Sequence, residues 1–313
     1  MPANIDPMKV LLVLTWFGTA YIAFVYRGSL SFVSYEDVYA QRSATEALGK
    51  DVFTAYFGAW LANVFIPFSA SYGLFAKKKL YYISAVVASI IFYMATADKA
   101  ILLFPFIILG IYRFLRNKDL KNSFSAIGLG FSGIMMITLA TGFSIIAALF
   151  WMRTIGNGGL LTRLYQEFFM NHKTTYFSHV NIINALTQSY PYGNRGIGQV
   201  VGQQYYTKEM NANANFWATD GIASFGDSGI IVASIIFFFI LLWFNKITSR
   251  YNKVFIICVL IPFISSLLNQ SLFSSLLTGG GFWIMFILSF KSTLHNKFIN
   301  ENSNNIRGEA PVH

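Results

Sequence analysis

Eight apolar segments, each near the length that crosses a lipid bilayer, constrain the fold of this 313-residue chain more than any other feature. A helix needs about 20 apolar residues to cross a hydrocarbon core of about 30 Å. Backbone groups in a bilayer must be bonded within the protein, and the sequence lacks the alternation of barrel strands, so each segment is predicted to be helical. The segments are Val10–Tyr26, Val52–Phe75, Leu80–Ala97, Ala100–Leu115, Phe124–Phe150, Ala223–Phe244, Val254–Leu268 and Leu272–Phe290. We therefore predict an all-α polytopic membrane protein with about eight transmembrane helices.

The last two segments also allow a second interpretation. Asn269, Gln270 and the run Gly279–Gly281 interrupt them, which is typical of one broken or re-entrant element. In either case residues 1–299 are predicted to form one membrane domain. Residues 300–313 are polar and are predicted to be a disordered cytoplasmic tail.

The composition excludes several classes of protein. Hydrophobic residues make up 55% of the chain and charged residues only 12%, about half the share of a soluble domain. The net charge of +10 lies mostly beside apolar segments, which indicates membrane topology rather than nucleic-acid binding. A single cysteine, Cys258, excludes both a disulfide framework and a thiolate metal site.

The distribution of basic residues predicts the orientation in the membrane. Short basic loops near Lys77–Lys79, Arg113–Lys121 and Lys246–Lys253, together with Lys9, Lys291, Lys297 and Arg307, hold about 14 of the 23 Lys and Arg residues. Placing these loops in the cytoplasm satisfies the positive-inside rule. Both termini are then cytoplasmic, and the large polar loop 151–222, between the fifth and sixth helices, lies on the outer face.

The basic residues of that loop lie on the side where the topology rule disfavours them. Arg153, Arg163 and Arg195 carry planar guanidinium groups that suit phosphate oxygens. The alternative is that each interacts with lipid headgroups. Lys99 follows Asp98 at an outer turn, where the two charges either mark a tight turn or contribute Lys99 to an anion site.

Acid–base residues in and after the loop are candidates for catalysis. Asp220 and His172 are the predicted general bases, and the alternatives are a helix N-terminal charge for Asp220 and a solvated ring for His172. His179 lies seven residues after His172, but no third ligand with suitable spacing follows, so a zinc site is not predicted.

Glycine and aromatic residues of the loop allow both functional and structural interpretations. Gly198 and Gly202, with the other loop glycines, favour close approach to a ligand or simple flexibility. Tyr165, Tyr176 and Phe177 are candidates for stacking on sugars, or for ordinary packing.

Three ordered patterns carry a family resemblance. They are TADKAILLFPFIIL, then MRTIGNGGLLTRLYQEFFMNHKTTYFSHV, then NANANFWATDGIASFGDSGIIVASII. In this order they resemble the bacterial O-antigen and capsule repeat-unit polymerases, over residues Tyr35–Phe290. Members of this family usually carry ten or more spans, so we expect that N-terminal helices of the family are missing from this chain.

The resemblance implies a glycosyltransferase of the bacterial inner membrane with its catalytic loop on the periplasmic or extracellular side. Its substrates would be oligosaccharides on undecaprenyl diphosphate, polymerised without a cofactor or metal and without nucleic acid. Membrane lipids, a flippase and a chain-length regulator would be its partners. In this setting Arg153, Arg163, Arg195 and Lys99 would bind diphosphate, with Asp220 or His172 as base. The alternatives are an O-antigen ligase acting on lipid A core and a transporter of lipid-linked oligosaccharides.

Overall fold

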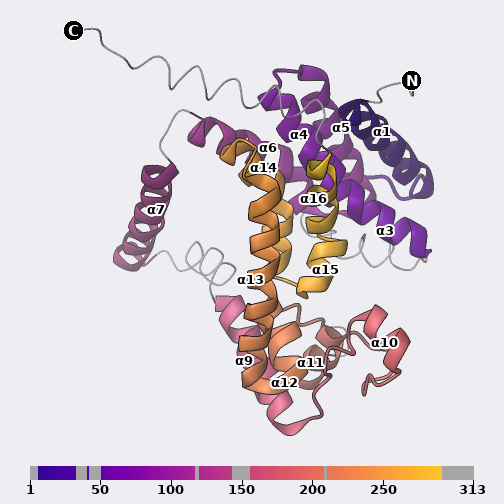
Figure 1. The fold of residues 1–313 in the computed structure, drawn as a ribbon, viewed down its shortest axis with the longest axis vertical. Coiled ribbons are helices and arrows are strands. Elements are labelled where there is room, and N and C mark those ends of the chain that lie inside the picture. The colour runs from indigo at the N-terminus through magenta and orange to yellow at the C-terminus, as the bar shows by residue number, and fades with distance from the viewer. Residues whose placement is uncertain are drawn as a thin grey trace. The chain divides into compact units, whose positions relative to one another are not determined.

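The structure, a computed structural model, describes residues 6–32, 41, 51–116, 120–142, 156–207 and 210–290. Within these ranges all the regular secondary structure is helical, as predicted (Figure 1). The chain divides into two compact units. Unit 1 comprises Met1–Asn117, Phe244–Phe263 and Leu276–His313, and unit 2 comprises Lys118–Trp243 and Ile264–Ser275.

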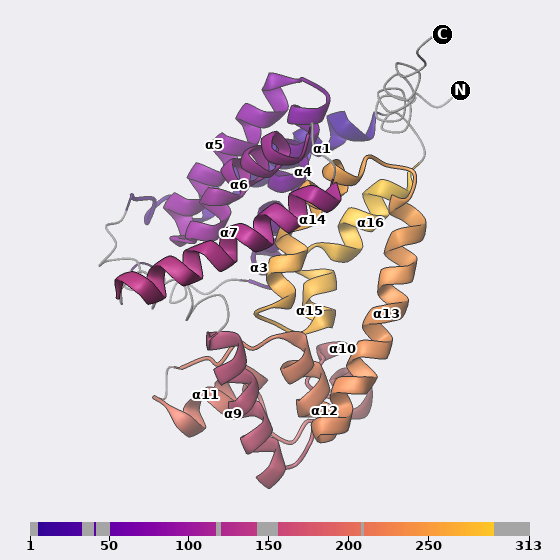
Figure 2. The ribbon, with the colours of Figure 1, turned by 90° about the vertical axis from the view of Figure 1, so that its left-hand side faces the viewer.

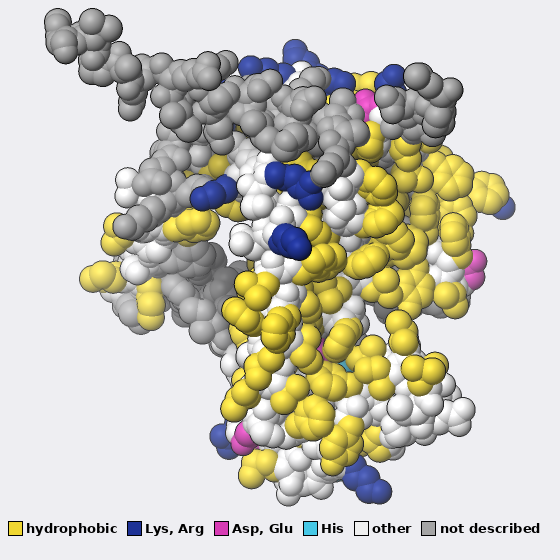
Figure 3. Space-filling view, in the orientation of Figure 1, with side chains coloured by type: hydrophobic (Ala, Val, Ile, Leu, Met, Phe, Trp, Pro, Cys, Tyr) yellow, Lys and Arg dark blue, Asp and Glu magenta, His cyan; other side chains and the backbone are white. Residues whose placement is uncertain are grey.

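Unit 1 is a bundle of apolar helices. Its elements are α1 (Pro7–Val25), α3 (Val52–Trp60), the π-helix η1 (Leu61–Phe65), α4 (Ile66–Phe75), α5 (Lys79–Thr96), α6 (Lys99–Leu115) and α16 (Gly281–Ser289). Helices α1, α4, α5 and α6 pack side by side (Figures 1 and 2). Hydrophobic side chains cover much of the visible surface of this unit (Figure 3).

Aspartates begin three of these helices. The carboxylates of Asp6, Asp51 and Asp98 accept hydrogen bonds from the first-turn amides of α1, α3 and α6. These amides have no partner within their own helix, and an aspartate at this position satisfies them and complements the helix dipole. The Asp98–Lys99 sequence therefore marks the turn that begins α6, which agrees with the turn interpretation of that pair.

Among the described residues, four helices are long and apolar enough to cross a membrane: Pro7–Val25, Val52–Phe75, Lys79–Thr96 and Trp217–Thr248. They match four of the predicted spans and are what a multi-pass membrane protein requires. Lys253–Leu267 (α14) is shorter, and the apolar part of α7 (Leu120–Thr141) is also short. The described residues therefore establish four candidate spans, while the predicted total of eight stays a prediction.

The predicted span Leu272–Phe290 is broken in the structure. Its first part is α15 (Leu272–Leu277), and after Gly280, whose φ is +88°, the chain continues as α16. In unit 1, Trp60 Nε1 donates to the Leu277 carbonyl and Asn63 Nδ2 donates to the Thr278 carbonyl, at 3.1 and 2.9 Å. Side chains at the end of α3 and within η1 thus donate to carbonyls that lose their helical partners at the break.

Unit 2 contains the polar loop, which is folded. Its elements are α7, α9 (Asn157–Asn171), α10 (Asn181–Thr187), α11 (Ile197–Tyr205), the π-helix η3 (Trp217–Ile222), α12 (Ala223–Phe225), the 3₁₀ helix η4 (Gly226–Ser228) and the first part of α13 (Gly229–Thr248). The apolar side of α9, formed by Leu164, Tyr165, Phe168 and Phe169, packs against α11 and η3 to form one hydrophobic core. The loop therefore folds around a core of its own.

Two glycines of α11 allow the chain before η3 to pack closely against that helix. A Cβ at Gly202 would lie 2.4 Å from the Met210 carbonyl oxygen, and one at Gly198 would lie 2.2 Å from Asn211 Oδ1. These distances leave no room for a side chain. At these two positions the glycines serve internal packing, rather than the ligand contact or simple flexibility predicted from sequence.

Candidate functional site

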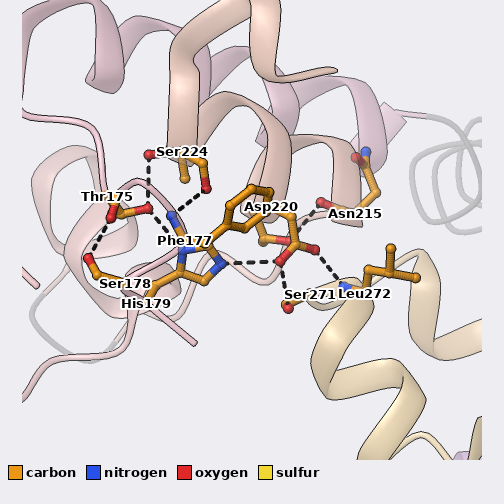
Figure 4. Close-up of polar contacts among 11 residues, drawn as sticks. Thr175, Phe177, Ser178, His179, Asn215, Asp220, Ser224, Ser271 and Leu272 are labelled. Carbon is orange, nitrogen blue, oxygen red and sulfur yellow. Dashed lines mark hydrogen bonds and ion pairs between the residues drawn. The ribbon is translucent and has the colours of Figure 1, made fainter. Parts of the chain in front are cut away.

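Unit 2 contains a polar cluster that we call the buried network, formed by Thr175, His179, Asp220 and Ser271 (Figure 4). Asp220 is only 1% exposed. Its Oδ1 atom lies 3.2 Å from His179 Nε2 and 2.8 Å from Ser271 Oγ, and its Oδ2 atom accepts from the Leu272 amide. Because a buried carboxylate requires hydrogen-bond donors, these contacts compensate for the loss of water.

Local backbone structure brings the members of the network together. Asp220 lies on η3, and an extra residue in the turn of a π-helix is a device often found at functional sites. The segment after α9 is held to α12, since the Thr175 amide donates to the Ala223 carbonyl and the Phe177 amide donates to Ser224 Oγ. Phe177 has a φ of +63°, and its ring contacts those of Phe225 and Phe273.

Hydrogen bonds in the network occupy both ring nitrogens of His179. Nε2 faces a carboxylate, which only accepts, so this nitrogen carries a proton. Nδ1 lies 2.9 Å from Thr175 Oγ1, which is also 3.1 Å from the Ala223 carbonyl oxygen. These two contacts leave the His179 ring without a lone pair open to a substrate.

A second group, which we call the aromatic cluster, consists of Phe168, His172, Tyr190 and Tyr192. The His172 ring is stacked on Phe168, with 4.0 Å between ring centroids and an interplanar angle of 2°. Tyr192 contacts Phe168, and Tyr190 contacts Tyr192, at 5.8 and 5.7 Å. The cluster therefore connects the end of α9 with the segment that precedes α11.

The exposed ring of His172 differs from that of His179 in having one open nitrogen. Its Nδ1 lies 2.9 Å from the Phe168 carbonyl oxygen, and a carbonyl only accepts, so Nδ1 carries the proton in the neutral ring. Nε2 then holds the lone pair, and no hydrogen bond to it is found among the described residues. The Phe168 carbonyl in the last turn of α9 thereby fixes the tautomer that a general base needs.

Arg195 lies at the other end of the aromatic cluster. Tyr190 Oη donates to the Arg195 carbonyl at 2.9 Å, and the exposed guanidinium of Arg195 donates to Gln203 Oε1 at 3.4 Å. Burial raises the pKa of Tyr190 to about 12; Tyr192 adds to this increase and the Arg195 charge opposes it. Tyr190 therefore remains a neutral donor at physiological pH. The cluster connects an open imidazole nitrogen with an exposed cation.

The structure distributes the other predicted site residues among different places. Arg163 lies on the exposed side of α9, in the same unit as the two clusters. Lys99 is the first residue of α6 and belongs to unit 1. Arg153 lies outside the described residues. Of the predicted bases, Asp220 is in the buried network and His172 is in the aromatic cluster, so the structure does not bring them into one hydrogen-bonded pair.

Sequence reasoning did not single out His179, Tyr190 or Tyr192. The sequence does not indicate that His179 pairs with Asp220, as it does in the structure. Two of the predicted stacking aromatics are not free to stack on a sugar: Tyr165 is fully buried and donates to the Ala212 carbonyl, while Phe177 packs internally. A signal was available in the run YPYGNR, where aromatic residues adjoin a cation.

Within the described ranges, no three His, Cys, Asp or Glu side chains come together in a way that could hold a metal ion. No protein-family profile, curated protein or solved structure matches the chain.

Proposed function

We propose that this protein polymerises oligosaccharide repeat units carried on undecaprenyl diphosphate, at the outer face of a bacterial inner membrane. The observation that carries the proposal is the open Nε2 atom of His172 in the aromatic cluster, whose Tyr190 donates to the backbone carbonyl of Arg195. A base for a sugar hydroxyl, aromatic surfaces for sugar rings and a cation for diphosphate are the groups that this reaction needs. The resemblance described above supports the same assignment.

The proposed reaction moves a glycan from one lipid carrier to the next repeat unit. The bond between the anomeric carbon of the donor and its diphosphate oxygen breaks, and a bond to the acceptor hydroxyl oxygen forms. The hydroxyl proton passes to Nε2 of His172, and the polyprenyl diphosphate leaves with the electron pair. A base in this position contributes typically about 10²–10⁴-fold to the rate.

Negative charge develops on the leaving diphosphate and requires positive side chains nearby. Arg195 and Arg163 are exposed on unit 2, and we assign them to this role together with Arg153. A guanidinium group offers paired donors to phosphate oxygens. Removing one donor that acts on the transition state is expected to cost about 2.7–4 kcal/mol.

Asp220 has a different proposed role from His172. Its oxygen atoms are buried and already accept from His179, Ser271 and Leu272, so it is assigned as a positioning residue. By contacting His179, Asp220 holds the end of the segment Thr175–His179 against η3 and so fixes the chain that follows His172. The proposal includes the orientation predicted above, with about eight spans and the loop 151–222 outside.

The proposal is tested by complementation of a strain that lacks the gene. Restored long lipid-linked glycan chains support a polymerase, whereas glycan on the lipid A core acceptor would identify a ligase. Movement of lipid-linked sugar without new glycosidic bonds would identify a transporter. Arg195→Ala is expected to lower polymerisation by roughly 10²–10³-fold. Arg116→Ala, which removes an exposed arginine at the end of α6, is the matched control and should retain activity.

A further inference from the structure

The polar loop of unit 2 contains a stretch without charge, which we call the uncharged segment. It covers residues 174–194, has no Lys, Arg, Asp or Glu residue, and is bounded by Lys173 and Arg195. Its helix, α10, has no buried residue. Ile182 and Leu186 are four positions apart, on one face of α10, and are 69% and 83% exposed. Exposed apolar surface of this kind marks contact with a membrane or with another protein.

The uncharged segment begins against a candidate membrane span. The rings of Tyr176 and Phe177 each contact the ring of Phe225, with 5.5 Å between centroids. Phe225 belongs to the candidate span Trp217–Thr248, and both it and Tyr176 are exposed. The apolar surface of the segment is therefore continuous with that of the span, which favours lipid as the material that covers both.

The length of α13 places this contact at one boundary of the hydrocarbon layer. Its 20 residues, Gly229–Thr248, extend about 30 Å, which is the thickness of that layer. Phe225, four residues before α13, then lies at the level of the lipid headgroups, where tyrosine side chains such as Tyr176 are enriched. In two perpendicular views α10 is level with the end of α13 that adjoins α12, rather than beyond it (Figures 1 and 2).

A second exposed apolar residue of unit 2 has different surroundings. Met170 is 76% exposed, but it lies on the same face of α9 as Arg163 and Glu167, which are exposed and charged. Charged side chains keep such a face in water. The uncharged segment has cations only beyond its two ends, so its composition suits the lipid–water interface.

We propose that α10 lies in the lipid–water interface of the membrane that α13 crosses, with Ile182 and Leu186 inserted among the lipids. In the orientation proposed above this is the outer face. The inference rests on the candidate span Trp217–Thr248 and holds whichever reaction the loop carries out. Under the proposed function, insertion of α10 would hold the neighbouring aromatic cluster at the level of the substrate diphosphate.

The test measures the depth of nitroxide labels on the full chain in phosphatidylcholine nanodiscs. Labels are attached to Leu186→Cys and, as the control, to Met170→Cys, and their collisions with oxygen and with a water-soluble nickel chelate are compared. The label on Leu186→Cys is expected to favour oxygen, which concentrates in lipid, and the label on Met170→Cys to favour the chelate. A sample without an introduced cysteine measures any label on the buried Cys258. Equal preference for the chelate at both positions would overturn the proposal.

A polar substitution in α10 provides the matched comparison. Leu186→Asn is expected to shift the label on Ile182→Cys towards the chelate by about tenfold or more, because a buried leucine contributes at least this factor to the preference for lipid. Met170→Asn should leave the same label unchanged. All four substituted positions are exposed, and labelled samples are compared only where their thermal unfolding matches that of the parent protein. An Ile182 label that does not respond to Leu186→Asn would contradict insertion of this face.

Two other outcomes would assign a different partner. Protection of the Leu186 label from both reagents would identify a protein that covers α10, such as a second copy of the chain. A requirement for phosphatidylglycerol would show that the flanking cations, rather than the apolar face, hold the segment at the membrane. Because no polymerisation is measured, failure of this inference and failure of the proposed function are distinguishable.

Discussion

Two histidines seven residues apart, His172 and His179, have opposite environments in the same folded loop. His179 is buried beside Asp220, and hydrogen bonds occupy both of its nitrogens. His172 is exposed, stacked on Phe168, and, within the part of the chain that the structure describes, hydrogen-bonded through Nδ1 alone. The comparison shows that an ionisable pair is not by itself a catalytic site. Access to a lone pair decides which histidine can take a proton from a substrate.

The first prediction tests whether the open nitrogen of His172 is needed for polymerisation. His172→Phe retains a ring to stack on Phe168 but removes the open nitrogen, so polymerisation is expected to fall by about 10²–10⁴-fold. Stability should change by no more than about 0.5 kcal/mol, because the site is exposed. Chain length of lipid-linked glycan is the measurement, and Asn171→Ala, at the neighbouring exposed residue, is the control. Full activity of His172→Phe would remove His172 from the mechanism.

The second prediction concerns the stability of the buried network. Asp220→Ala leaves His179, Ser271 and the Leu272 amide without their acceptor, and breaking a buried pair in this way costs about 3–5 kcal/mol. Asp227→Ala removes an exposed carboxylate that accepts from Gln166 and should cost little. Hydrogen exchange of peptides from unit 2 measures both.

A double variant tests whether Asp220 and His179 stabilise the fold as a coupled pair. Replacing Asp220 and His179 together should cost less than the sum of the two single replacements, because neither partner is then buried alone. Additive losses would show that the two residues are not coupled. Asp220→Asn, which retains the shape of the side chain, should retain more stability than Asp220→Ala.

The third prediction concerns the close packing that places the loop. Gly202→Ala puts a methyl group 2.4 Å from the Met210 carbonyl oxygen, so the backbone must move, at a cost of roughly 1–3 kcal/mol. Gly159→Ala is the control, since nothing lies within 4 Å of its Cβ position and the residue is inside helix α9. There alanine should stabilise the helix by up to about 1 kcal/mol. Thermal unfolding of the purified protein compares the two.

The sequence predicts features that depend on local segments better than features that depend on contacts between residues far apart in the chain. Apolar length alone predicts the spans at Pro7–Val25 and Val52–Phe75, because the requirement of the bilayer is local. The Gly279–Gly281 run likewise indicates the break before α16. The partner of Asp220 could not be predicted in this way, since the contact joins residues 41 positions apart through a π-helical turn that has no simple sequence pattern.

The fourth prediction, with the smallest effect, tests the tyrosine next to Arg195. Burial raises the pKa of Tyr190 from about 10 to about 12, so between these pH values the unfolded chain loses the phenolic proton while the folded chain retains it. Stability is therefore unaffected by this group below pH 10 and falls as pH rises from 10 to 12. Tyr190→Phe should reduce that fall, and it also removes a hydrogen bond worth about 0.5–1.5 kcal/mol. An identical slope in the parent protein and in Tyr190→Phe would show that Tyr190 is not the titrating group.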